Sequence, residues 1–172
     1  FRVGAVAIDH DASPHVLSDA LAATVAAHWE RRAGTNPRLF DGDILLFRDV
    51  AVAEGVLRAT AVTVKYAVLA ALLDLRPPGL ALVNLFGAAA PLASDGALLL
   101  GRMGPHTFEP GAVKFASGTP DLSDLDRPGG TVDLDGSILR EFAEETGLDP
   151  AAARPAPGYV VAREGPYLAI VR

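Results

Sequence analysis

The stretch Arg140-Glu-Phe-Ala-Glu-Glu-Thr-Gly-Leu148 joins a cluster of acidic residues to a glycine stop. Its glutamates Glu141, Glu144 and Glu145 stand at i, i+3 and i+4, which predicts one helical face with Cβ atoms about 5–6 Å apart. Like charges at this spacing destabilise a helix, and the negative end of the helix dipole disfavours them further. A hard divalent cation would reverse both penalties because it prefers oxygen ligands. The stretch therefore predicts a metal site, with a solvated acidic face as the alternative.

The helix that carries these glutamates is predicted over 137–146. Gly147 supplies the left-handed residue with which many helices end. Leu139 and Phe142 give the opposite face apolar surface to bury, and Arg140 can reach Glu144 at i+4 and relieve part of the repulsion.

Two further helices are predicted. The first starts at the hydroxyl and proline of Ser13-Pro14, runs to about Arg32 and ends at Gly34. The second covers 65–75 and is stopped by two prolines. Apolar side chains recur at four-residue steps in the first helix, which predicts a buried stripe: Leu17, Leu21, Val25 and Trp29.

Strands are predicted where apolar or alternating runs lie between turn residues. They fall at 3–8, at 80–86, 97–100 and 113–116, in a hairpin over 44–64 about Glu54-Gly55, and in a hairpin over 159–171 about Gly165-Pro166. Asn36-Pro37 marks a turn, and 118–135 is predicted to be a loop. Helices and strands in irregular order predict an α/β or α+β fold.

Composition limits the class of protein. The chain has 172 residues, half of them hydrophobic, which suits one domain with a sizeable core. The absence of cysteine excludes a disulfide framework, a thiolate metal site and a cysteine nucleophile. A net charge of −6 disfavours nucleic acid as a partner. Six acids and one base lie from Asp133 to Asp149, so most of the excess charge surrounds the acidic helix.

No membrane or export segment is recognised. The longest apolar stretch, 79–93, is interrupted by polar, glycine and proline residues and is shorter than the roughly 20 residues that span a bilayer. Asp9 and Asp11 follow the N-terminus closely, without a cleavage-type region, and no initiator methionine is present. We expect a cytoplasmic protein with no membrane partner, as a monomer or a homodimer.

The stretch 140–148 resembles the second half of the Nudix hydrolase signature, Arg-Glu-apolar-x-Glu-Glu-x-Gly-apolar, and every specified position matches. The resemblance implies a Nudix-type α/β/α sandwich with a mixed sheet. It makes 1–172 a single domain, in which 1–78 is an N-terminal extension of helix plus hairpin and 79–172 carries the signature.

The first half of the signature departs from the family pattern. Asp126 and Val132 stand where the family usually has a glycine and a glutamate. Two alignments remain open: Gly129-Gly130 is the family's glycine pair and the loop is shorter, or Ser117-Gly118 is the pair and the loop is longer.

We prefer Gly118, because 110–115 resembles the family's strand leading into its glycine turn. That strand would deliver Gly118 beside the helix, with its backbone carbonyl facing the metal. Asp133 or Asp135 is the candidate replacement for the missing glutamate.

The family hydrolyses nucleoside diphosphates linked to another group. The resemblance implies one to three Mg²⁺ or Mn²⁺ ions held by Gly118, Glu141, Glu144 and Glu145. Such ions neutralise the phosphates and activate a bound water. Glu144 and Glu145 are the expected principal ligands, and Glu141 is a ligand or the general base. Arg140 belongs to the catalytic set and is expected to orient a glutamate by ion pairing.

Basic residues that could hold the phosphates are Arg102, Lys114 and Arg163, with surface solvation as the alternative. Glu164 is a candidate base, because several family members take their base from a downstream loop. The histidines show no ligand spacing and are expected to be ordinary: His10, His15, His28 and His106.

The pattern Trp-x-x-Arg-x-x-x-Asn-Pro-x-Leu-Phe-Asp-Gly over 29–42 is similar to a stretch ahead of the signature in the nucleotide-sugar (UDP-glucose) branch. The loop after the glycine is also longer in that branch, which favours the Gly118 alignment. A buried tryptophan followed by an Asn-Pro turn is the alternative interpretation.

Only 24 residues follow Leu148, whereas Nudix domains normally continue to a closing helix. Either the chain is a fragment, or the N-terminal elements fill the missing places. Two functions remain: a metal-dependent hydrolase of a small-molecule nucleoside diphosphate derivative, favoured by the intact half-signature, and a catalytically silent Nudix-fold module that binds nucleotide or metal.

Overall fold

The computed structural model describes residues 1–36, 39–104, 110–127 and 129–172. Pro37 of the predicted turn and His106 lie outside the described residues. No described helix has the length and apolar character needed to cross a membrane.

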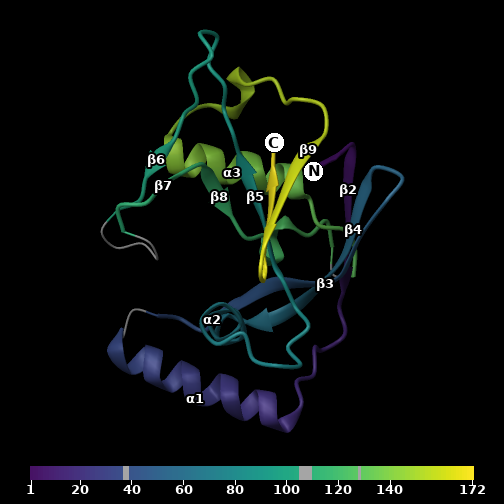
Figure 1. Cartoon of the computed structure of the whole chain (residues 1–172), viewed down its shortest axis with the longest axis vertical. Helices are drawn as coiled ribbons and strands as arrows, with labels where there is room; N and C mark the ends of the chain where they lie inside the picture. Colours follow the sequence, from purple (N-terminus) through teal and green to yellow (C-terminus); the bar gives the residue numbers. More distant parts are fainter. Residues whose placement is uncertain (37–38, 105–109, 128) are drawn as a thin grey trace.

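The described residues form an α+β fold with three α-helices between and around mixed sheets, which confirms the predicted class (Figure 1). The helices are α1 (Asp19–Thr35), α2 (Tyr66–Asp74) and α3 (Leu134–Thr146). Two short 3₁₀ turns accompany them, η1 (Leu122–Asp124) and η2 (Pro150–Ala152). Figure 1 shows α1 at one end of the molecule and α3 in the other half, with β3 and β4 between them.

The strands form three sheets. A five-stranded sheet has the order β1 (Arg2–Val3), β9 (Tyr159–Glu164), β10 (Tyr167–Val171), β5 (Asn84–Ala89) and β8 (Ala116–Gly118). A three-stranded sheet has the order β2 (Ala5–Asp11), β4 (Val56–Lys65) and β3 (Asp43–Ala53), and β6 (Gly101–Arg102) pairs with β7 (Val113–Lys114). The hairpins β3–β4 and β9–β10 confirm the two predicted ones.

The three-stranded sheet contributes to two cores where β3 is buried on both faces, since successive side chains of a strand point to opposite sides. Leu45 and Phe47 belong to a core shared with α3 and the five-stranded sheet, whereas Leu46 between them belongs to a second core with α1 and α2. Trp29 packs against that second core, edge-on to Tyr66. The two ends of the molecule are therefore joined through one shared sheet.

Several predicted boundaries are wrong. Helix α1 begins at Asp19, with the Ser18 hydroxyl accepting from the Leu21 N–H, whereas the Ser13 N–H donates to Asp11 in a turn. Gly34 lies inside the helix, where a glycine costs only about 1 kcal/mol.

Two predicted strands also change. The residues 97–100 form no strand, because Leu98 makes only an isolated bridge to Leu92. The strand predicted at 80–86 begins at Asn84, where its pairing with β10 starts. The predicted loop 118–135 contains η1, whose turn is closed by side-chain caps from Asp121 and Asp124.

The buried residue His10 anchors the loop that precedes α3. Its Nδ1 accepts from the Gly129 N–H at 3.1 Å, and its backbone N–H donates to the Gly130 carbonyl at 2.8 Å. Since Nδ1 is an acceptor, Nε2 carries the proton and donates to Thr63 Oγ1 at 3.0 Å. His10 thus has a structural task, and it holds Gly129-Gly130 against β2.

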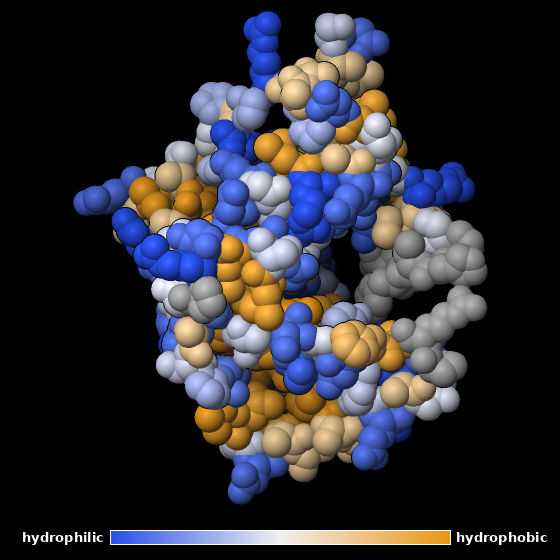
Figure 2. Space-filling model, turned by 180° about the vertical axis from the view of Figure 1, so that it is seen from behind, coloured by the Kyte–Doolittle hydropathy of each residue, from blue (hydrophilic) through white to orange (hydrophobic). Residues whose placement is uncertain are grey.

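Seen from behind, the surface alternates hydrophilic and apolar patches and is hollowed near its middle (Figure 2).

At the start of α3, Asp135 joins the helix to the five-stranded sheet. Its carboxylate accepts from the Tyr159 hydroxyl at 2.9 Å and forms an ion pair with Arg172, whose guanidinium lies 5.1 Å from the centre of the Tyr159 ring. Burial, together with the bond to Asp135, raises the pKa of Tyr159 to about 12.

We predict that Tyr159 titrates about two pH units later than an exposed tyrosine. The folded state holds this proton more tightly than the unfolded chain, so the stability that it contributes is present below pH 10 and is lost as the pH rises through about 12. Ultraviolet titration of phenolate should show a late step that Tyr159→Phe removes and Tyr66→Phe leaves. A late step that survives Tyr159→Phe would contradict the assignment.

Candidate functional site

Helix α3 lies unusually close to the sheet on which it packs. It starts at Asp133, whose side chain accepts from the Gly136 N–H, and it ends at Gly147 in the left-handed conformation (φ 71°). A Cβ at Gly87 of β5 would lie 2.4 Å from Ile138, so only glycine admits this helix. The close packing brings the second half of α3 against β8.

Gly118 lies directly beside Glu141. A Cβ at Gly118 would stand 2.2 Å from Glu141 Cδ and within 2.6 Å of both carboxylate oxygens. The glycine is needed here for space, since its φ does not lie in the left-handed region. Gly118 therefore lies beside α3, whereas Gly129 and Gly130 contact β2 and the loop that precedes α3.

The three glutamates do not share one environment. Glu145 accepts the Ser117 N–H of β8 at 3.1 Å, so Glu141 and Glu145 both contact this strand. The side chain of Glu144 is 61% accessible, compared with 18% for Glu141, and its carboxylate lies 3.5 Å from the Arg140 guanidinium. In the part of the chain that the structure describes, no three acidic or histidine side chains are grouped as a metal-binding set.

Arg140 contacts three carboxylates. It makes bonds of 3.0 and 3.2 Å to the two carboxylate oxygens of the buried Asp124 and a bond of 2.8 Å to Glu141. The weaker contact to Glu144 confirms the i+4 reach predicted for this arginine. These contacts give Arg140 the orienting position that we expected from the sequence.

Asp124 was not predicted as a site residue, and the two aspartates predicted to replace the missing glutamate lie elsewhere. Asp133 caps the start of α3 and Asp135 pairs with Arg172, so both lie at the far end of the helix from the glutamates. Asp124 supplies an acidic partner of Arg140, and its carboxylate also accepts the N–H of Asp121, the N-cap of η1. The signal for it was the Asp-x-x-Asp spacing of a capping box inside the supposed loop.

Electrostatics set Glu141 apart from its neighbours. Burial raises its pKa, the charges of Glu144 and Glu145 add to the rise, and the guanidinium of Arg140 opposes it. A carboxylate that is partly removed from water beside two like charges gains from a cation more than an exposed one does.

The oxygen donors at this site are of the type that hard cations take, although the described residues do not gather three of them into one metal-binding group. Carboxylate and backbone carbonyl oxygens are the ligands that Mg²⁺ and Mn²⁺ prefer. Glu141, Glu145 and Gly118 stand together at one strand, and the cradle against Gly118 exists only because that residue has no side chain.

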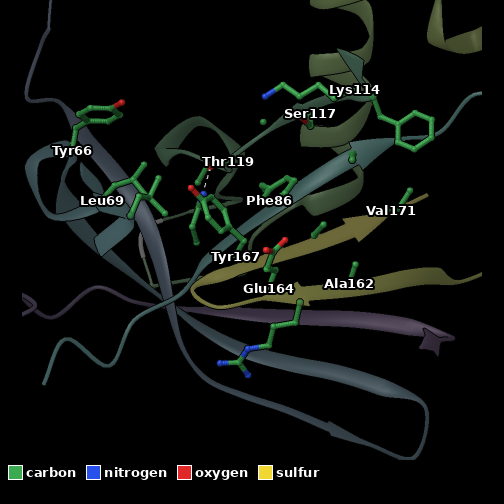
Figure 3. A pocket seen from close by; sticks show the side chains of 17 residues that line it. Tyr66, Leu69, Phe86, Lys114, Ser117, Thr119, Ala162, Glu164, Tyr167 and Val171 are labelled. Carbon is green, nitrogen blue, oxygen red and sulfur yellow. Dashed lines mark hydrogen bonds between the residues drawn. The ribbon is translucent and has the colours of Figure 1, made fainter. Parts of the chain in front are cut away.

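A cleft of about 680 Å³ opens on the opposite face of the five-stranded sheet from α3 (Figure 3). Side chains of α2 form one wall, and β5, β8, β9 and β10 form the other. Lys114, Ser117 and Gly118 line it, so the cleft adjoins the acidic site across the edge strand β8. Its volume is in the range of small-molecule sites.

The predicted phosphate-binding residues separate. Lys114 and Arg163 line the cleft, whereas Arg102 is exposed on β6 and does not line it. Glu164 also lines the cleft, but three strand spacings and a three-residue offset put its Cα roughly 17 Å from that of Gly118. Glu164 is therefore too far away to serve as a base for water bound at Gly118.

The chain was compared with known proteins. No family model matches it, and no curated protein matches it significantly. The Nudix resemblance therefore rests on 140–148 and on the surroundings of that segment.

We predict that Gly118→Ala lowers the free energy of unfolding by about 1–3 kcal/mol, because the new methyl overlaps the Glu141 carboxylate. Combining it with Glu141→Ala should recover most of this loss in a double-mutant cycle followed by urea denaturation. Gly101→Ala is the control, since its Cβ would meet only an ordinary contact at 3.9 Å. Additive effects of the two site substitutions would contradict the close approach.

We predict that Asp124→Asn destabilises the protein by about 1–2 kcal/mol, because the charge-assisted bonds to Arg140 become neutral ones. Thermal unfolding monitored by circular dichroism measures the change. Asp95→Asn in an exposed turn should have a smaller effect. An equal melting temperature for Asp124→Asn and the unsubstituted protein would show that the Asp124 charge does not contribute to the stability of the fold.

Proposed function

We propose that the chain is a Nudix-type pyrophosphatase, which hydrolyses the diphosphate bond of a nucleoside diphosphate linked to another group with the help of Mg²⁺ or Mn²⁺. The observation that carries the proposal is the meeting of Glu141 and Glu145 with the backbone of Ser117-Gly118. This is the contact expected if residues 140–148 and Gly118 belong to one signature. A soluble nucleotide sugar in the cytoplasm is the leading substrate, on the similarity of residues 29–42 to that branch.

The metal, when bound, would neutralise the diphosphate and lower the pKa of an attacking water. Glu144, Glu145, Glu141 and the Gly118 carbonyl would hold it. Arg140 keeps Glu141 oriented, and Asp124 keeps Arg140 in place. Lys114 lies at the cleft, where its ammonium can meet a phosphate.

A second candidate is a silent module that binds nucleotide or metal. It is favoured by the spread of the three glutamates, because Glu145 faces the Ser117 N–H and Glu144 faces solvent. From this arrangement, a metal could bind all three glutamates only if their carboxylates turned toward a common point.

Turnover decides between the two candidates. We predict release of phosphate, after phosphatase coupling, from UDP- or ADP-linked sugars in the presence of Mg²⁺. Glu144→Gln and Glu145→Gln should each lower kcat by about 10²-fold or more, because each removes a charged ligand. Glu30→Gln on the exposed face of α1 is the matched control and should leave kcat unchanged.

Two results would contradict the hydrolase proposal: no turnover of any linked diphosphate, or unchanged turnover in Glu144→Gln. Calorimetry with Mg²⁺ and UDP-glucose would then show whether the silent module is correct. Binding without turnover supports the module, and absence of binding removes both candidates.

A further inference from the structure

The cleft beside Gly118 has two chemically different ends and an apolar middle. Lys114, Ser117 and Gly118 form the end next to the acidic site, and Glu164 and Tyr167 form the other. Arg163 also lines the cleft, but it precedes Glu164 on β9, so its side chain starts from the opposite face of the sheet. Between them the walls are mostly apolar: Leu69 and Leu73 of α2 on one side, and Phe86, Ala162, Ala169 and Val171 of the sheet on the other. Such a site suits an elongated ligand with one charged end.

The strand register gives the cleft its length. Tyr167 pairs with both Glu164 and Asn84, whereas Gly118 pairs with Gly87, three residues further along β5. The Cα atoms of Gly118 and Glu164 are therefore roughly 17 Å apart. An extended nucleoside diphosphate with its phosphates at Gly118 is long enough to bring its far group to Glu164.

The far end offers hydrogen-bond acceptors, and a fixed amide lies between the two ends. Figure 3 shows the Glu164 carboxylate turned into the cleft beside Tyr167. The Thr119 hydroxyl donates to Asn84 Oδ1 at 2.9 Å, which orients this buried amide. An ionised carboxylate only accepts hydrogen bonds, so it favours hydroxyl or N–H groups and repels an anion.

Resting on the proposed function, we propose that Glu164 determines substrate specificity: the cleft takes an uncharged, hydroxyl-bearing substituent of the diphosphate and rejects one that carries a further negative charge. Residues of α2 complete the pocket, so the N-terminal part of the chain contributes directly to substrate choice.

Two matched ligand pairs test the proposal. UDP-glucose and UDP-glucuronate differ by a charge on the sugar, and ADP-ribose and 2′-phospho-ADP-ribose differ by a charge on the nucleoside. We expect the native chain to prefer the less charged member of at least one pair by 10-fold or more in kcat/KM. The pair that is discriminated identifies the half of the substrate that enters the cleft.

Substitution of Glu164 then locates the discrimination. Glu164→Gln should bring the ratio within the discriminated pair close to one, mainly through KM, with kcat changed less than twofold. Glu54→Gln, in the exposed turn of the other hairpin, should leave the ratio unchanged. Ala162→Trp, at an exposed position on the cleft wall, should raise KM for every substrate.

Binding separates this proposal from the hydrolase proposal. The four ligands are titrated by calorimetry into the native chain and into the Glu164→Gln variant, with Ca²⁺ in place of Mg²⁺, so that all three glutamates remain available to a cation. An affinity ratio that Glu164→Gln abolishes supports the proposal even if the native chain turns nothing over. Equal affinities within both pairs, a ratio that Glu164→Gln leaves intact, or absence of binding overturns it.

Discussion

The structure depends on the close approach of α3 to the five-stranded sheet. Two glycines make this distance possible: Gly87 leaves space for the Ile138 side chain, and Gly118 leaves space for the Glu141 carboxylate. Each position has its neighbour well inside the distance that a Cβ would tolerate. Because interiors are densely packed, a methyl group at either site would displace the helix or its side chains. The acidic site exists only at this separation.

The short distance between α3 and the sheet also explains how the charges around the helix are paired. Bringing Glu141 against β8 removes part of its carboxylate from water, which raises its pKa. Arg140 offsets that cost, and the buried Asp124 offsets the cost of placing Arg140 there. Breaking one partner of such a chain leaves a charge without compensation. Asp124 therefore belongs to the site although it lies outside the acidic stretch.

The N-terminal part of the chain shapes the site from the other side. Its three-stranded sheet contributes side chains to both cores, so it connects α2 to the core beneath α3. Residues of α2 then face the five-stranded sheet across the cleft. The first strand, β1, also joins the edge of that sheet beside β9. The segment that looked like an extension in the sequence is thus structurally part of the fold that holds the cleft.

Local patterns in the sequence determined the elements: the helix end at Gly147, the hairpins about Gly55 and Gly165, and the helix that follows Lys65 all depend on neighbouring residues. Boundaries failed where competing caps stood close together, as at Ser13 and Ser18. Only the tertiary structure decided that Gly118 meets Glu141, that Asp124 meets Arg140, and that Glu164 lies at the far end of the cleft. The reason is physical: these contacts follow from strand register and from the packing of distant segments, which no local periodicity encodes.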